Sequence, residues 1–133
     1  MIDIENEIIT TIHDKIIVSY PNAKFESVLN LNPSDFPCIC IEEIDNTSYS
    51  MSIDSASNEN HAAVVFEINI FTNNATGKKG TAKAILSDID SLMISMGFSR
   101  ILKNPISLDE GTKYRIVTRY NATVSADHTI YRR

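Results

Sequence analysis

The sequence predicts an α+β fold, in which two α-helices pack on one face of a mixed, mainly antiparallel β-sheet. Two segments repeat apolar residues at helical spacing, and several others alternate apolar and polar residues as strands do. The segments follow one another as helix, strands, helix, strands, so neighbouring strands are expected to pair antiparallel beneath the two helices. At 133 residues, with 43% hydrophobic and 22% charged residues, the chain fits one domain spanning residues 1–133.

The first helix is expected over residues 3–19. Asp3 is its expected N-cap, and because a residue before proline disfavours helix, the helix should end before Pro21. β-Branched isoleucines give weak local helix propensity, so this helix is expected to depend on packing against the sheet. Its apolar face consists of Ile4, Ile8, Ile9, Ile12 and Ile16.

The region after this helix is expected to contain two strands and a long loop. A short strand is expected within residues 23–29, and FPCICIEEID predicts a strand over residues 36–45. Residues 46–60 are polar and lack a period, which predicts a loop with at most an irregular strand at residues 49–53. A loop of this length is often functional.

The middle of the chain predicts a strand followed by the second helix. Residues 61–73 form the strongest strand signal, with Glu67 and Asn69 on the face opposite the apolar one. A loop then leads to a helix over residues 78–96, for which Gly97 is a natural C-cap. The apolar stripe of that helix is expected to be Ala82, Ile85, Ile89, Leu92 and Met96.

The C-terminal third predicts a further strand over residues 98–107, interrupted at Pro105, and a turn at residues 109–111. The final long strand alternates, with a turn and a short returning strand at residues 129–132 after it. Its apolar face is Tyr114, Ile116, Thr118, Tyr120, Ala122 and Val124, and its other face is Lys113, Arg115, Val117, Arg119 and Asn121.

Charge is distributed unevenly along the chain, whose formal net charge is −5. Residues 1–60 hold eleven acidic and two basic residues, whereas residues 61–133 hold six acidic and ten basic residues. One interpretation is a set of solvated faces. The other is self-association, because two oppositely charged surfaces on one molecule suit a head-to-tail contact that closes into a ring. The overall acidity argues against a sequence-specific nucleic-acid partner.

The loop NATGKKGT at residues 74–81 has the context of a phosphate-binding loop but lacks its pattern. A P-loop needs Gly-x-x-x-x-Gly-Lys followed by Ser or Thr, whereas Gly77 and Gly80 are three residues apart and Thr81 follows Gly80. A basic loop before a helix is therefore the preferred interpretation. No cofactor is expected.

Cys38 and Cys40 alternate along one strand and are expected to be small apolar core residues. Zinc sites generally combine more widely spaced cysteines with a second pair of ligands, and the three histidines are scattered. No nucleophile elbow or working acid/base pair is evident, so the chain is not expected to be an enzyme. No segment has the roughly 20 apolar residues that a membrane helix requires, and the N-terminus does not resemble a signal peptide.

The candidate functional residues are charged groups that could form a subunit or partner interface. Alternation makes Lys113, Arg115 and Arg119 a stripe on one strand face. Arginine is favoured at interfaces because its planar group pairs with carboxylates in two-point geometry, although a solvated outer sheet face remains the other interpretation. The full candidate set is Glu42, Glu43, Asp45, Lys78, Lys79, Lys113, Arg115, Arg119, Arg132 and Arg133, with the acids expected to meet the bases of a neighbouring copy.

Taken along its whole length, the chain resembles the tail terminator and tail-completion proteins of tailed phages and phage-tail-like bacteriocins. The resemblance consists of an Ile-rich first helix, the stretches FPCICIEE, VVFEINIFTNN and SLMISMGF, and the closing YRIVTRYNATVSADHTIYRR. It covers nearly all of the chain at the level of pattern and includes no short diagnostic motif. It supplies no residue-level functional positions.

The resemblance implies a structural protein that assembles into a homohexameric ring. Such a ring caps the tail tube, stops tail polymerisation and gives the head connector a surface on which to dock. The implied partners are other copies of the chain, the tail tube, the neck proteins and, in a contractile tail, the sheath. The implied location is the tail-neck junction of a virion or tail-like particle, and the host cytoplasm during assembly. The alternatives are a head-tail joining or other neck protein and, more remotely, a nucleotide- or RNA-binding domain.

Overall fold

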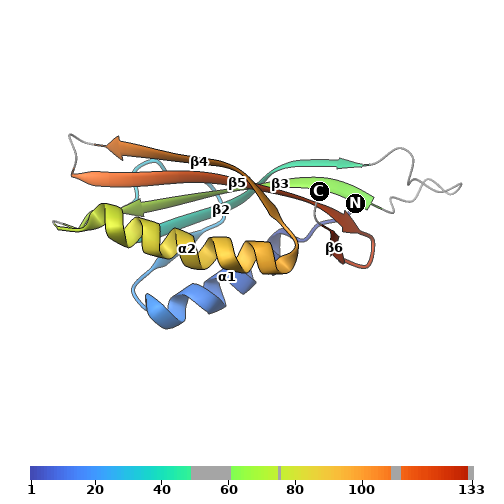
Figure 1. The fold of residues 1–133 in the computed structure, drawn as a ribbon, viewed down its shortest axis with the longest axis horizontal. Helices are drawn as coiled ribbons and strands as arrows, with labels where there is room; N and C mark the ends of the chain where they lie inside the picture. Colours follow the sequence, from blue (N-terminus) through green and yellow to red (C-terminus); the bar gives the residue numbers. More distant parts are fainter. Residues whose placement is uncertain (49–60, 75, 109–111, 132–133) are drawn as a thin grey trace, which may run out of the picture.

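One six-stranded sheet supports both helices on a single face, which confirms the predicted fold class (Figure 1). The computed structural model describes residues 1–48, 61–74, 76–108 and 112–131. Its elements in chain order are α1 (Glu5–Ser19), β1 (Lys24–Glu26), β2 (Cys38–Ser48), β3 (His61–Thr72), α2 (Lys78–Met96), β4 (Ser99–Leu108), β5 (Lys113–Ser125) and β6 (Ile130–Tyr131). Within the described residues, neither helix is long and apolar enough to cross a membrane.

The strands are ordered β1-β2-β3-β5-β4 across the sheet, and β6 pairs with β5. Every pairing is antiparallel except that of β1 with β2. The edge strand β1 is short and pairs only with Cys38–Cys40. In the described part of the chain, therefore, no strand covers the outer edge of β2 beyond Cys40, or the outer edge of β4.

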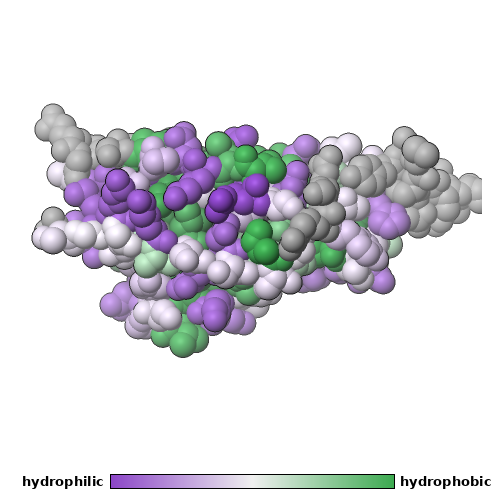
Figure 2. All heavy atoms as spheres, viewed as in Figure 1, coloured by the Kyte–Doolittle hydropathy of each residue, from purple (hydrophilic) through white to green (hydrophobic). Residues whose placement is uncertain are grey.

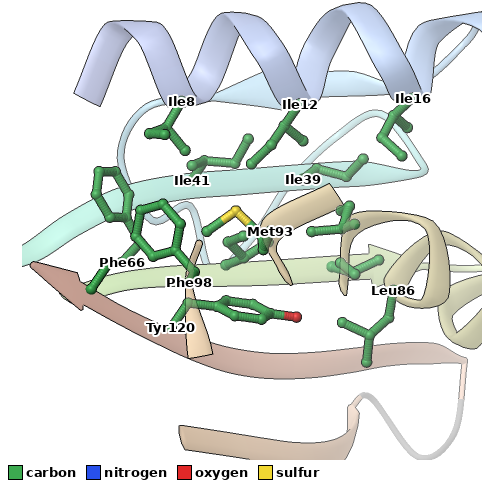
Figure 3. Close-up of a cluster of buried hydrophobic side chains, with 14 of the residues drawn as sticks. Ile8, Ile12, Ile16, Ile39, Ile41, Phe66, Leu86, Met93, Phe98 and Tyr120 are labelled. Carbon is green, nitrogen blue, oxygen red and sulfur yellow. The ribbon is translucent and has the colours of Figure 1, made fainter. Parts of the chain in front are cut away.

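The core fills the space between the helices and the sheet (Figure 3). Ile8, Ile12 and Ile16 of α1 point toward Ile39 and Ile41 of β2, and each of the five is at most 2% exposed. The β-branched isoleucines of α1 have weak intrinsic helix propensity. Packing of their side chains against β2 stabilises the helix instead.

The second helix packs against β3, β4 and β5. Phe66 of β3 and Phe98, which follows α2, meet edge to face with ring centroids 5.6 Å apart. Asp90 accepts a hydrogen bond from the Tyr120 hydroxyl at 2.7 Å and another from Arg100 at 3.1 Å. Burial raises the pKa of Tyr120, with the hydrogen bond to Asp90 adding to the effect, so the phenol stays protonated as the donor.

Gly97 ends α2, as the sequence predicts. Its φ of 108° is in the left-handed region, and the backbone amides of residues 97 and 98 bond back to Ile94 and Met93. A β-carbon at this position would lie 3.0 Å from the carbonyl oxygen of Ile130. Glycine is therefore required both for the backbone conformation and for the close approach of β6.

Several predicted boundaries were wrong. The N-cap of α1 is Ile4, and the Asp3 carboxylate instead accepts from the Glu5 amide at 3.1 Å. Strand β2 continues through Ser48, into the predicted loop. Strand β4 is not interrupted at Pro105, because it is an edge strand, where a proline without an amide proton is tolerated.

The buried stripe of α2 also differs from its prediction. Leu86 and Met93 are buried, whereas Leu92 and Met96 are only partly buried. The face of α2 that packs against the sheet is therefore rotated about the helix axis relative to the predicted stripe. The predicted irregular strand at residues 49–53, the turn at 109–111, and Arg132 and Arg133 lie outside the described residues.

Replacing Ile12 by alanine tests whether α1 is held by its buried face. Ile12 is 0% exposed, so Ile12→Ala should lower the free energy of unfolding by about 2–5 kcal/mol in urea denaturation. Val18, on the same helix, is 81% exposed, and Val18→Ala should change it by no more than about 0.5 kcal/mol. Equal losses in the two variants would show that α1 is not docked by this face.

Candidate functional site

The sheet face that carries no helix, here called the outer face, holds the predicted basic stripe. In β5, Tyr114, Ile116 and Tyr120 are buried beneath the helices, so the alternating Lys113, Arg115 and Arg119 lie on the outer face. The predicted alternation of this strand is confirmed. The face is therefore charged along β5.

The arginines of the stripe have partners within their own chain. Arg119 lies directly across from Glu67 of β3, with its Nε and Nη2 both 3.0 Å from Glu67 Oε2. Arg115 Nε donates to Asn69 Oδ1 at 2.9 Å, and Asn69 Nδ2 donates to Glu67 Oε1 at 3.0 Å. The four side chains thus form one hydrogen-bonded network that fixes both arginine heads over β3.

Aromatic rings support the same stripe. The Arg115 guanidinium lies 5.6 Å from the ring centroid of Phe71, and the Lys113 ammonium lies 5.8 Å from that of Phe36. The sequence placed Glu67 and Asn69 on the polar face of their strand but did not identify them as partners of the arginines. The missing information was the pairing of β3 with β5 and its register.

The three candidate acids of β2 do not form a single patch. Glu42 and Asp45 lie across from the outer-face residues Glu67 and Val65, whereas Glu43 lies opposite Phe66 on the helix-covered face. A register shift between Glu43 and Asp45 places Asp45 on the same face as Glu42. A β-bulge of this kind adds one residue to a strand and changes which side chains share a face.

Glu43 is half-buried among other acids. Its backbone amide donates to Glu5 Oε2 at 2.8 Å, and its own Oε1 accepts from Asn46 Nδ2 at 3.1 Å. Burial raises the pKa of the Glu43 carboxyl, with Asp3, Glu5 and Asp45 adding to the effect. The charged groups that shift this pKa are thus all acids, which define an acidic cluster at the edge of β2.

Lys78 and Lys79 occupy the first turn of α2, where Lys79 is exposed and Lys78 is half-buried. The nearby open cavity of about 680 Å³ has Tyr20, Asn22 and Thr81 in its lining, and neither lysine lines it. The preceding strand, β3, lies between two antiparallel neighbours. A phosphate loop generally follows a parallel strand, so this arrangement does not favour a nucleotide site.

The outer face also contains a cluster of sulfur and carboxylate atoms beside β1. Cys38 and Cys40 are buried with Phe71 in a small second cluster, which confirms their expected burial. Parallel pairing places Glu26 next to Cys40, and Glu26 Oε2 lies 3.5 Å and 3.9 Å from the two sulfur atoms. Sequence reasoning did not find this third group, because it comes from another strand.

Comparison with known proteins gives no family for the chain. No family model matches it, and no curated protein sequence does. Several solved structures match, and one of them aligns over 90% of this chain and 94% of its own length, with 9% sequence identity and a TM-score of 0.49. A similarity of this size does not bear on function.

Replacing Glu43 by glutamine tests the acidic cluster through its pH dependence. A carboxyl whose pKa is raised by folding destabilises the fold when it is charged, and this penalty disappears as pH falls through the raised pKa toward the unfolded value. Glu43→Gln should therefore be more stable than the wild type near pH 7 in urea denaturation.

The difference should shrink below about pH 4, where the wild-type carboxyl is protonated in both states. Asp14→Asn, at an exposed position of α1, is the matched control and should show no such pH-dependent gain. A Glu43→Gln variant that is less stable at both pH values would contradict the assignment of an uncompensated acidic cluster.

Proposed function

We propose that this chain is a structural protein of a phage tail or a phage-tail-like particle, and specifically a ring-forming tail terminator. The observation that supports self-assembly most directly is that the sheet has two uncovered edges of opposite charge in the described part of the chain. The resemblance of the sequence to tail terminators supports the identity of the ring. Neither feature requires catalysis.

The edge formed by β4 is basic and partly apolar. Between Ser99 and Leu108 it contains Arg100 and Lys103 and no acidic residue. Ile101 is 52% exposed, and hydrophobic surface is visible toward the top of the molecule, where β4 runs (Figure 2). A long edge strand with exposed apolar side chains is a template for pairing with another chain.

The edge formed by the second half of β2 is acidic. It contains Glu42, Glu43 and Asp45 and no basic residue, and Ile44 is 40% exposed. The acids around Glu43 lie close enough to raise its pKa. Cations from a neighbouring copy would relieve this repulsion, which favours a contact between the β4 edge of one copy and the β2 edge of the next.

The strand directions permit such a contact to repeat. Within the sheet, β4 runs antiparallel to β2, because β2 is antiparallel to β3, β3 to β5, and β5 to β4. A rotation about an axis along the strands preserves their direction, so β4 would meet the neighbour's β2 antiparallel, like most of the sheet. The contact is heterologous, and it closes into a ring where the rotation permits.

In this proposal the ring acts by shape and charge. Copies that join edge to edge surround the end of the tail tube, cover the surface on which the next tube subunit would add, and present a new surface to the neck. The fixed network around Arg115 and Arg119 gives each copy a rigid charged face for contact with the tube, the neck or, in a contractile tail, the sheath. Lys78, Lys79 and Lys113 add positive charge at the end of the sheet where β3 ends and β5 begins.

Charge reversal at the two edges tests the proposed contact. Native mass spectrometry of the wild-type chain, alone or bound to purified tail tubes, should give a hexamer. Lys103→Glu and Asp45→Lys should each weaken assembly at least tenfold, because each places like charges across the contact. An equimolar mixture of the two variants should assemble again, since every contact in an alternating ring then joins opposite charges.

Lys83→Glu is the control, because it makes the same charge change at an exposed position of α2 away from both edges. Equal weakening by Lys83→Glu and Lys103→Glu would show a nonspecific charge effect and contradict the edge contact. A wild-type chain that stays monomeric even on tail tubes, or that binds nucleotide as a monomer, would contradict the proposed function.

Deleting the gene in the strain that produces the particles tests the terminator role itself. Electron microscopy should then show tails of uncontrolled length, and the wild-type chain supplied in trans should restore a uniform length. Tails of normal length that fail to join heads would indicate a head-tail joining protein instead.

A further inference from the structure

Three possible metal ligands converge beside the short edge strand β1. One carboxylate oxygen of Glu26 and the sulfur atoms of Cys38 and Cys40 all lie within 4.8 Å of one another. The oxygen is 3.5 Å from the sulfur of Cys38 and 3.9 Å from that of Cys40. The two cysteines come from adjacent outer-face positions of β2, and the glutamate comes from the parallel strand beside them.

These distances match the spacing of ligands around a tetrahedral metal ion. Zinc is bound at about 2.3 Å by sulfur and about 2.0–2.2 Å by carboxylate oxygen, which places neighbouring ligand atoms roughly 3.5–3.8 Å apart. The present separations from oxygen to sulfur are close to this range. Small side-chain rotations would bring these oxygen-to-sulfur separations into the range.

The surroundings suit a thiophilic ion better than they suit plain core packing. Cys38 is 0% and Cys40 1% exposed, and both pack with Phe36 and Phe71. The partners that the Glu26 carboxylate meets there are two thiol groups, which are only weak hydrogen-bond donors, so a stronger partner would be favourable. A divalent cation would supply that partner, while the half-buried Glu26 leaves a route from solvent.

We propose that the sulfur atoms of Cys38 and Cys40 and the carboxylate of Glu26 form a binding site for a thiophilic divalent cation of the zinc class. Three protein ligands leave one tetrahedral position for water or another donor. Binding displaces the thiol protons to solvent, because the thiolate is the ligand. The site is independent of the proposed tail function, and its effect would be to fasten β1 to β2.

This fastening addresses a weakness of the fold. Strand β1 has three residues, and its backbone is attached by a short parallel ladder and by a hydrogen bond of 2.9 Å from the Lys24 amide to the Pro37 carbonyl oxygen. Its Phe25 side chain also packs against the core and the His13 ring. A metal held by both strands would cross-link them. A disulfide between the two cysteines would not, because both belong to β2.

Cobalt titration of the metal-free, reduced full-length chain tests the site. Co²⁺ should bind at one equivalent and produce a thiolate charge-transfer band together with the visible bands of tetrahedral cobalt, and Zn²⁺ should displace it. Cys38→Ser and Cys40→Ser should each abolish or strongly weaken the charge-transfer band. Glu26→Gln should keep the band and lower affinity at least tenfold, because the thiolates remain and one ligand is lost.

Glu42→Gln is the matched control, since it removes another half-buried outer-face carboxylate and should leave Co²⁺ affinity unchanged. Circular dichroism checks the fold of each variant, and Glu26→Gln provides a test at a site outside the buried sulfur cluster. Zn²⁺ should also raise the melting temperature of the wild type more than that of Glu26→Gln.

A folded wild-type chain that gives no charge-transfer band would overturn the site. So would a band that persists in both cysteine variants, or a Glu26→Gln affinity equal to that of Glu42→Gln. Formation of a Cys38–Cys40 disulfide under mild oxidation, with no metal uptake by the reduced chain, would also overturn it.

Discussion

The antiparallel register between β3 and β5 is the constraint on which the rest of the structure depends. It runs from His61 opposite Ser125 to Thr72 opposite Tyr114. The same register places Phe66 and Tyr120 together beneath the helices and Glu67 beside Arg119 on the outer face. A slip of one residue would move every side chain of one strand to the other face, so it would break the core and the polar network together. The charged outer face is thus as firmly specified as the core.

The pairing of the sheet edges with another chain is determined less completely by the structure. Both exposed edge segments contain a register shift, between Glu43 and Asp45 in β2 and between Arg100 and Leu102 in β4. Bulges are common at sheet edges because they limit pairing with other chains. In β2 the Glu43 amide is also occupied by the Glu5 carboxylate. Beyond each bulge the pairing with the inner neighbour is regular again, so we expect the proposed contact to lie on those segments.

The local pattern of apolar and polar residues predicts well which face of an element a side chain occupies. It predicts poorly which side chain on another element that residue contacts. The alternation of β5 correctly separated Tyr120 from Arg119, and Gly97 correctly ended α2, because each depends on a few neighbouring residues. Glu67 as the partner of Arg119 depends on strand order, which no local pattern encodes. Glu43 shares the helix-covered face with Ile41 by plain alternation, whereas Asp45 lies on the outer face because the bulge between them adds one residue to the period. Glu26 approached the cysteines because three residues pair in parallel, a ladder too short to leave a signal.

The position of β1 links the two proposals through the geometry of β2. Strand β1 covers β2 at Cys38–Cys40, so the uncovered edge begins at Ile41. If β1 came away, the cover beside two buried thiols and Phe71 would be lost, and apolar surface would join an edge whose next residues are acidic. The exposed edge would then be longer, and acidic residues would make up a smaller part of it. Such an edge would pair less selectively with other strands, because fewer of the possible registers would be excluded by charge repulsion. Whatever fastens β1, whether its short ladder and the packing of Phe25 or a bound cation as well, therefore also determines which part of β2 is left for a neighbour.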